Sequence, residues 1–106
     1  YQSIAQISCV LNEDHMVIIT DVLVHHEHRG RGIATDLFYY VFRFFKSKNV
    51  HSFTLDDCSD QFDTDQNIYK KLGFTYDTQG DPEMTLKMDN INFELSHHLN
   101  NIMICE

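Results

Sequence analysis

The chain has 106 residues, of which 42% are hydrophobic, and its formal net charge is −8. This length suits one domain, and the acidic balance argues against a basic surface that binds nucleic acid. No apolar run is long enough to span a membrane and no signal peptide is recognisable, so we expect a cytoplasmic or nuclear protein that binds no membrane. Three widely spaced cysteines lack the pairing of a zinc site or a disulfide framework and are predicted to be buried reduced thiols, namely Cys9, Cys58 and Cys105.

The first quarter of the sequence predicts a β-hairpin. Apolar and small residues from Ile4 to Leu11 predict one strand, Asn12 to Asp14 a turn, and Met16 to Val24 a second strand. Alternation along the second strand places Thr20, Val22 and Val24 on one face and Asp21 and Leu23 on the other. Asp21 is a carboxylate in an otherwise apolar run and therefore needs a partner or a purpose. It is the first candidate catalytic residue.

The run Arg29-Gly30-Arg31-Gly32-Ile33-Ala34 follows the second strand and separates it from a predicted helix. Two glycines allow a tight turn that exposes successive amides, and the start of a helix points unpaired N–H groups and a positive dipole end at the same place. This combination predicts a site for phosphate or pyrophosphate. The alternative is a plain turn, which is the commoner meaning of a glycine pair before a helix.

The helix is predicted from Ile33 to Lys48, and it is followed by a third strand from Val50 to Leu55. A strand, a helix and a strand in this order predict a parallel crossover, in which ligands bind beyond the carboxyl ends of the strands. The helix is rich in aromatic residues on more than one side. Either it has a wide core-facing surface or it also packs against a partner subunit, so a homodimer is a possible assembly.

The rest of the chain predicts shorter elements. Asp63 or Thr64 caps a helix that runs to Leu72 and ends at Gly73, and strands follow from Phe74 to Asp77 and from Glu83 to Met88. Beyond them, Ile91, Leu95, Leu99, Ile102 and Met103 fit a helical face, although a strand from Ile91 to Leu95 is also possible.

Two polar clusters lie in the predicted loops. The first holds five carboxylates that either attract a cationic substrate or form a solvated loop with helix caps, namely Asp56, Asp57, Asp60, Asp63 and Asp65. The second, His25 to His28, contains three histidines and Glu27, which suggest metal ligands. Because this loop borders the predicted phosphate site, we expect no metal and interpret its histidines as loop residues.

Two sequence blocks resemble the GNAT N-acetyltransferases. Val24, a four-residue loop and Arg29-Gly30-Arg31-Gly32-Ile33-Ala34 are similar to the family's acetyl-CoA signature, which has Arg or Gln, two residues, Gly, one residue, and Gly or Ala. Asn67-Ile68-Tyr69-Lys70-Lys71-Leu72-Gly73-Phe74 resembles a second block that ends in Gly-Phe. The resemblance implies an acyl-CoA N-acyltransferase-like α/β fold with a mixed, mostly antiparallel sheet, a central strand-helix-strand crossover and flanking helices. We expect one domain over residues 1–106, with a core at 4–88 and an extension at 89–106.

The resemblance also implies direct transfer of an acetyl group from acetyl-CoA, the cosubstrate, to an amine in a ternary complex. Backbone groups near Leu23 and Val24 would pair with the pantetheine arm, and the amides from Arg29 through Gly30, Arg31, Gly32 and Ile33 to Ala34 would hold the pyrophosphate. Asn67 is assigned to cofactor binding as part of the second block. Tyr69 would protonate the departing thiolate, or else only pack its helix.

The family's usual base position on the strand before the phosphate loop corresponds to Thr20, so the neighbouring Asp21 is the candidate base. It could instead bind substrate or be structural. The acceptor is expected to be a polyamine, an amino-sugar phosphate or a lysine side chain. The alternative function is a non-catalytic CoA-binding sensor or assembly module.

The chain starts at Tyr1 and shows no counterpart of a strand and two helices that usually precede the family's core. We expect either that it is part of a longer product or that residues 90–106 or a second subunit build the acceptor site.

Overall fold

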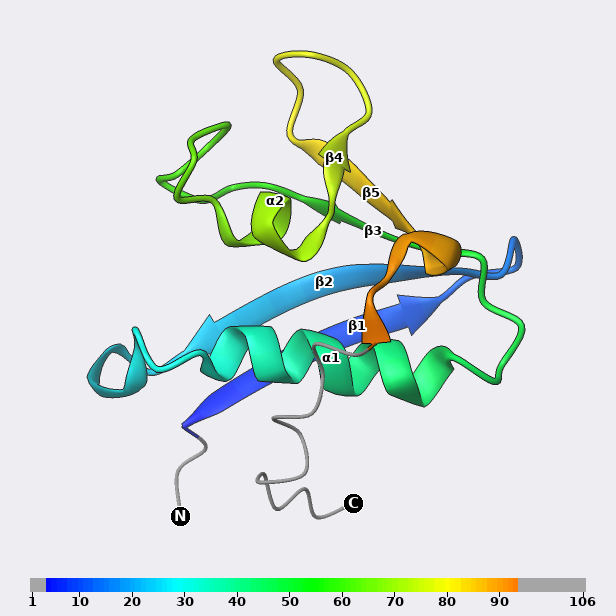
Figure 1. The fold of residues 1–106 in the computed structure, drawn as a ribbon, viewed down its shortest axis with the longest axis horizontal. Coiled ribbons are helices and arrows are strands. Elements are labelled where there is room, and N and C mark those ends of the chain that lie inside the picture. Colours follow the sequence, from blue (N-terminus) through cyan, green and yellow to red (C-terminus); the bar gives the residue numbers. More distant parts are fainter. Residues whose placement is uncertain (1–3, 94–106) are drawn as a thin grey trace.

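The computed structural model describes residues 4–93, which form a five-stranded sheet with two α-helices (Figure 1). The strand order is β1-β2-β3-β5-β4, and only the β2–β3 pair is parallel. The predicted mixed, mostly antiparallel sheet with one central crossover is therefore confirmed. The elements are β1 (Ala5–Leu11), β2 (Met16–Val24), α1 (Ile33–Phe45), β3 (Ser52–Asp56), α2 (Ile68–Leu72), β4 (Thr75–Tyr76) and β5 (Glu83–Lys87), with 3-10 turns at His26–His28 and Met88–Asn90.

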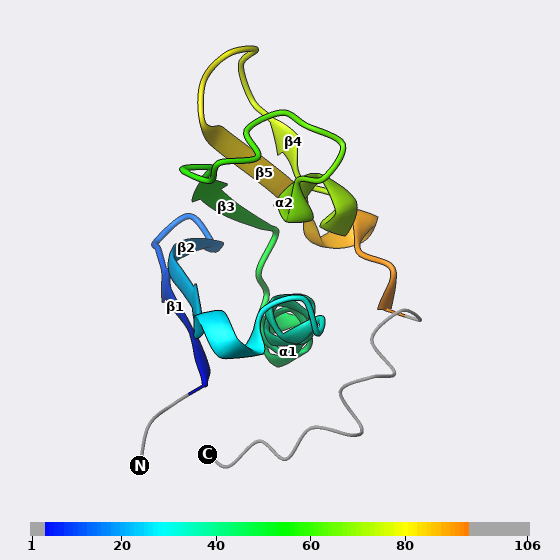
Figure 2. The same cartoon turned by 90° about the vertical axis from the view of Figure 1, so that its left-hand side faces the viewer.

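The hydrophobic core lies between the sheet and α1. Phe38 and Phe42 on α1 are fully buried, and the Phe42 ring lies 4.8 Å from that of Phe53 on β3. Phe38 also contacts Tyr69 on α2, with ring centroids 5.9 Å apart. Both helices lie on the same face of the sheet (Figure 2). Phe44, in contrast, is 45% exposed, so α1 carries an exposed aromatic residue besides its core-facing ones, and a homodimer stays a prediction.

Local hydrogen bonds explain where the hairpin and α1 end. The predicted turn is confirmed, because the side-chain oxygen of Asn12 accepts from the amides of Asp14 and Met16. The helix ends at Phe45 rather than at the predicted Lys48. The amide of Lys46 donates to the carbonyl of Arg43, three residues back, and this tighter turn replaces the α-helical pattern.

The helix α2 is shorter than predicted, and it begins after Asn67 rather than after Asp63 or Thr64. Asp63 has a positive φ of 53°, and Asn67 itself is extended, so no continuous helix passes through residues 63–67. At the other end Gly73 adopts a left-handed φ of 108°, and the amide of Phe74 donates to the carbonyl of Tyr69. This Gly73 cap confirms the predicted helix end.

Strand β2 contains an irregularity that the alternating pattern does not reveal. Ser8 pairs with Asp21 and Cys9 pairs with Ile19, so Thr20 is an extra residue opposite β1. Such a β-bulge shifts the alternation by one residue and bends the strand. As a result Thr20 is exposed, whereas Val22 lies half-buried against the core. The prediction that Thr20 shares a face with Val22 is wrong for this reason.

Two further predictions concern side chains and the end of the chain. Cys58 is exposed and Cys9 only half-buried, so the expectation of buried thiols is wrong for Cys58. Cys105 lies outside the described residues, as does most of the helix or strand predicted beyond Ile91. None of the helices within residues 4–93 is both long and apolar enough to cross a membrane.

Candidate active site

A cleft opens where β2 and β3 separate. The parallel pairing of the two strands runs from Met16 opposite Ser52 to Ile18 opposite Thr54 and then stops. Beyond that point the bulge bends β2 away, and a cavity of about 710 Å³ lies between the strands. We call this cavity the β2–β3 cleft. It is lined by Ile18, Ile19, Thr20, Asp21, Val22, Thr54, Leu55, Asp56, Cys58, Ser59, Tyr69 and Glu83.

The structure brings both predicted catalytic residues to this cleft. Asp21 reaches it from the bulged part of β2, and Tyr69 reaches it from α2. The Tyr69 ring packs edge-on against Phe38 and Phe74, with centroid distances of 5.9 and 6.4 Å. Burial raises the pKa of the Tyr69 hydroxyl, and the negative charge of Asp57 and the thiol of Cys58 raise it further. Tyr69 is therefore a protonated hydrogen-bond donor at neutral pH.

The glycine loop forms a second cavity, of about 210 Å³, at the start of α1. Gly30 and Gly32 have φ angles of 79° and 76°, and a Cβ at either position would meet no atom within 4 Å. The first helical hydrogen bond runs from the Asp36 amide to the Gly32 carbonyl at 3.0 Å. Among the described residues, no protein group accepts a hydrogen bond from the amides of residues 30–35. These free donors at the positive end of a 13-residue helix form an anion cradle.

The anion cradle is lined by most residues predicted to bind the pyrophosphate. They are Arg29, Gly30, Gly32, Ile33 and Ala34, accompanied by Val24, His28, Thr35 and Ile68. Arg29 is held in place because its Nε donates to the carbonyl of Val24 at 3.1 Å. Arg31 is exposed and does not line the cavity, so its assignment to the cofactor stays a prediction.

The anion cradle and the β2–β3 cleft meet at the first turn of α2. Ile68 lines the cradle, and its neighbour Tyr69 lines the cleft. On the sheet side, β2 passes between the two cavities, with Val22 in the cleft and Val24 in the cradle. Because β3 pairs with β2 only as far as Ile18, no strand in the described part of the chain neighbours this part of β2 on its β3 side. An extended ligand could therefore lie along it.

Leu23 and Val24 stand at the end of this unpaired edge. Val24 lines the anion cradle, whereas Leu23 is 51% exposed and lines a third cavity of about 310 Å³ with Gln6, His25 and His26. The predicted contacts with a pantetheine arm involve the backbone of these residues, and they stay a prediction.

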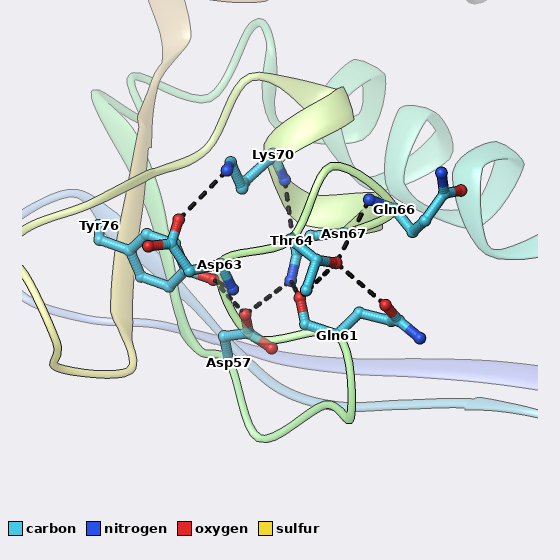
Figure 3. Close-up of polar contacts among 8 residues, drawn as sticks. All are labelled: Asp57, Gln61, Asp63, Thr64, Gln66, Asn67, Lys70 and Tyr76. Atoms are coloured by element: carbon cyan, nitrogen blue, oxygen red, sulfur yellow. Dashed lines mark hydrogen bonds and ion pairs between the residues drawn. The ribbon is translucent and has the colours of Figure 1, made fainter.

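Asn67 has a structural role that the sequence did not suggest. Its side chain is 1% exposed, and its Nδ2 donates to Asp57 Oδ2 at 2.7 Å and to the Gln61 carbonyl at 3.1 Å (Figure 3). Its Oδ1 accepts from the Lys70 amide at 3.0 Å and so caps α2. All its side-chain polar atoms are bonded within the protein, so Asn67 caps α2, and its assignment to cofactor binding stays a prediction.

Asp57 is the residue at the centre of this network, and the sequence presented it only as one of five loop carboxylates. It is 3% exposed and accepts from Ser59, Asn67 and Tyr76. Burial alone would raise the pKa of Asp57, but these hydrogen bonds outweigh burial and lower it. Only the tertiary structure distinguishes this buried anion from its exposed neighbours.

Glu83 is a second residue that sequence reasoning missed. It begins β5 and lines the β2–β3 cleft together with Asp21 and Asp56. A hydrogen bond with Asp77 and repulsion by its charge raise the pKa of Glu83. The sequence signal available was a carboxylate at the start of the last predicted strand, which is too common to point to a site.

The histidine loop lies beside the anion cradle. His25, His26 and Glu27 are exposed, and each offers one possible ligand atom within 4.8 Å of the others. The His25 and His26 rings stack with centroids 4.6 Å apart. The expectation that this loop binds no metal stays a prediction.

The sequence profile of the Acetyltransferase (GNAT) family matches residues 2–74. This chain belongs to the GNAT family. The matched segment includes β2, β3, the anion cradle and α2, and the predicted membership of the family is confirmed. A comparison with curated proteins gave no match.

Solved structures similar to this GNAT chain share its fold. A GNAT acetyltransferase from Staphylococcus aureus Mu50 superposes with a TM-score of 0.68 at 18% identity, covering 80% of this chain and 60% of that one. A bacterial toxin gives 0.61 at 23% identity, with 78% and 49% covered. A mutant of the toxin AtaT, bound to the C-terminus of the antitoxin AtaR and acetyl-CoA, gives 0.60 at 12% identity, with 88% and 61% covered. This chain thus spans about half to three fifths of these proteins.

Proposed function

We propose that this GNAT chain transfers an acetyl group from acetyl-CoA to a primary amine by direct attack in a ternary complex. The observation that carries the proposal is the meeting of the two cavities at α2, where Ile68 lines the anion cradle and Tyr69 lines the β2–β3 cleft. An anion-binding end and a proton-donating end, joined by an unpaired strand edge, match the chemistry of a long diphosphate thioester. The finding that the similar toxin AtaT was solved with acetyl-CoA supports this choice of cosubstrate.

The anion cradle is where the diphosphate of acetyl-CoA would bind. The free amides of residues 30–35 and the positive end of α1 favour a negative ligand, and the side chain of Arg29 adds a positive charge. From there the pantetheine arm would follow the open edge of β2 past Val24 and Leu23, in the manner of an added strand. The thioester would then lie in the cleft beside Tyr69.

Tyr69 supplies the acid of the reaction. When the amine nitrogen attacks the thioester carbonyl, the new C–N bond forms, the C–S bond breaks and the sulfur leaves as a thiolate. The Tyr69 hydroxyl donates its proton to that sulfur. The raised pKa of Tyr69 keeps this proton in place at neutral pH, and a solvent proton restores the hydroxyl after product release.

The acceptor proposed here is a cationic amine. Among residues 4–93, those lining the cleft include Asp21, Asp56 and Glu83 but no lysine, arginine or histidine. This charge attracts an ammonium group and repels the phosphate of an amino-sugar phosphate, so a polyamine or a lysine side chain is favoured over that candidate. The ammonium must lose one proton before attack. The cleft carboxylates that can accept it are Asp21, Asp56 and Glu83, and the pKa of Glu83 is raised.

The test is Tyr69→Phe in the full chain, assayed for acetyl transfer to polyamines, lysine peptides and amino-sugar phosphates. We expect kcat to fall by about 100-fold or more while the affinity for CoA stays unchanged. Tyr40→Phe is the matched control, because Tyr40 lines neither the anion cradle nor the cleft. A wild-type chain that binds CoA but acetylates no amine would instead support the alternative of a CoA-binding sensor or assembly module.

A further inference from the structure

Tyr69 lies on the helix α2, which is too short to be stable by itself. The helix α2 has five residues. An isolated helix of this length is unstable in water, because ordering the backbone of the first turn costs more free energy than its one hydrogen bond contributes. The position of the Tyr69 hydroxyl in the cleft therefore depends on the groups that fix the two ends of α2.

The C-terminal end of α2 is fixed by backbone geometry. Gly73 adopts its left-handed φ of 108°, and the amides of Gly73 and Phe74 donate to the carbonyls of Lys70 and Tyr69. This is a helix cap of the usual glycine kind, and it anchors α2 to the start of β4.

The N-terminal end of α2 is fixed by the buried side chain of Asn67, which is held in turn by the buried side chain of Asp57. Asn67 caps the helix through its Oδ1, and the same side chain is held by Asp57 Oδ2 at 2.7 Å from its Nδ2. Asp57 in turn accepts from the Tyr76 hydroxyl on β4 (Figure 3). It also accepts from the Ser59 amide at 3.0 Å and from the Ser59 hydroxyl. One carboxylate thus ties the loop after β3, the strand β4 and the start of α2 together.

Asp57 also acts on Tyr69 through its charge. Its pKa lies below the usual value despite burial, so it is ionised at neutral pH. Within residues 4–93, the charged or ionisable groups that act on the Tyr69 hydroxyl are Asp57 and Cys58, from the loop after β3. The carboxylates Asp21, Asp56 and Glu83 line the same cleft. Of Asp57 and Cys58, Asp57 has the larger electrostatic effect on the Tyr69 hydroxyl.

We propose that Asp57 is the positioning residue for Tyr69, holding the catalytic hydroxyl in the cleft through Asn67. The inference rests on the proposed role of Tyr69 as the acid. It extends that role, because it makes catalysis depend on a buried carboxylate that lines neither the cleft nor the anion cradle.

Two substitutions separate the two actions. Asp57→Asn keeps the size of the side chain but removes the charge, and we expect kcat to fall about 10- to 100-fold with little change in the KM for acetyl-CoA. Removing the charge also lowers the pKa of Tyr69, so the alkaline decline of kcat should begin at a lower pH. Asn67→Ala removes the hydrogen bond to Asp57 and the N-terminal cap of α2 but keeps the negative charge of Asp57. It should lower kcat while leaving the alkaline decline in place.

Asp60→Asn is the matched control, because Asp60 is exposed in the same loop and outside both cavities. Thermal unfolding of each variant shows whether it is folded, and Asn67→Ala carries the test of positioning if Asp57→Asn does not fold. An ultraviolet titration of phenol ionisation, comparing each protein with its Tyr69→Phe derivative, reports the pKa of Tyr69 without any need for activity.

The outcomes keep the two proposals apart. If Tyr69→Phe lowers kcat but folded Asp57→Asn and Asn67→Ala keep the wild-type kcat, the positioning role is wrong and the catalytic role stands. If Asp57→Asn loses activity but the pKa of Tyr69 does not move, the electrostatic action is wrong. If Tyr69→Phe leaves kcat unchanged, the proposed acid role fails, whatever the other variants show.

Discussion

The anion cradle gives the sharpest test of where acetyl-CoA binds, through the substitution Gly32→Glu. Gly32 caps α1 with a left-handed φ of 76°, and a Cβ there would enter open space with no atom within 4 Å. The new Cβ therefore contacts no neighbouring atom, and the glutamate side chain begins beside the free amides. It would oppose a diphosphate directly, and it would also partly cancel the positive dipole end of the helix.

The expected magnitude follows from charge and distance. Two unit charges 4 Å apart interact by about 1 kcal/mol at the dielectric of water and by about 4 kcal/mol at an effective dielectric near 20. Because the cradle is open to solvent and the glutamate can turn away, we expect the repulsion to weaken the binding free energy of CoA by about 1 to 2 kcal/mol. This corresponds to roughly 5- to 30-fold weaker binding of CoA.

The assay is calorimetry with CoA on Gly32→Glu and on Gly32→Ala. Alanine carries the same backbone strain as glutamate, about 1 kcal/mol for a left-handed residue, but no charge. The difference between the two variants therefore isolates the charge, and it should shrink as salt is added. Equal dissociation constants for the two variants at low salt would refute the placement of the diphosphate at this loop.

Three further outcomes are expected. Gly73→Ala should lower the free energy of unfolding by about 1 to 3 kcal/mol in urea titrations, because φ is 108° and the Cβ would lie 3.2 Å from Leu86 Cδ1. Gly80→Ala has backbone strain but open space around its Cβ, so it should lower the free energy of unfolding by less. Equal losses in the two variants would contradict this reasoning. Since folding lowers the pKa of Asp57, its contribution to stability is present at neutral pH and lost as pH falls through the carboxyl range. Asp57→Asn should therefore flatten the acid side of the stability curve, and an unchanged curve would contradict the assignment. Glu83→Gln should raise the KM for polyamines roughly two- to fivefold and that for monoamines less, measured by initial rates; a uniform effect would argue against a cationic site.

Much of the fold could be predicted because its signals are local. Alternating apolar residues mark β2, glycine and asparagine mark turns, and helical spacing marks α1. The glycine loop before Ile33 could also be predicted, since glycine itself readily adopts the left-handed φ that Gly30 and Gly32 show. The prediction of α1 was wrong only at its end, where a tighter hydrogen bond at Lys46 shifted the boundary, whereas the bulge at Thr20 inside β2 was not predicted.

The candidate site could be predicted only in part. That Tyr69 and Asp21 carry useful chemistry could be inferred from residue type and sequence block, but their convergence on one cleft could not. It depends on the bulge at Thr20 and on the separation of β2 from β3 after Ile18, both of which arise from pairing with other strands.

The sequence alone thus determined the order of the elements, the loop that presents free amides and the family to which the chain belongs, because each is carried by neighbouring residues. The tertiary structure decided which of five loop carboxylates is buried. Asp57 differs from Asp60 only in what surrounds it, and Tyr76 and Asn67 reach it from 19 and 10 positions away in the chain. A carboxylate's burial, its partners and its pKa are properties of that assembled environment and are not written in any one stretch of the chain.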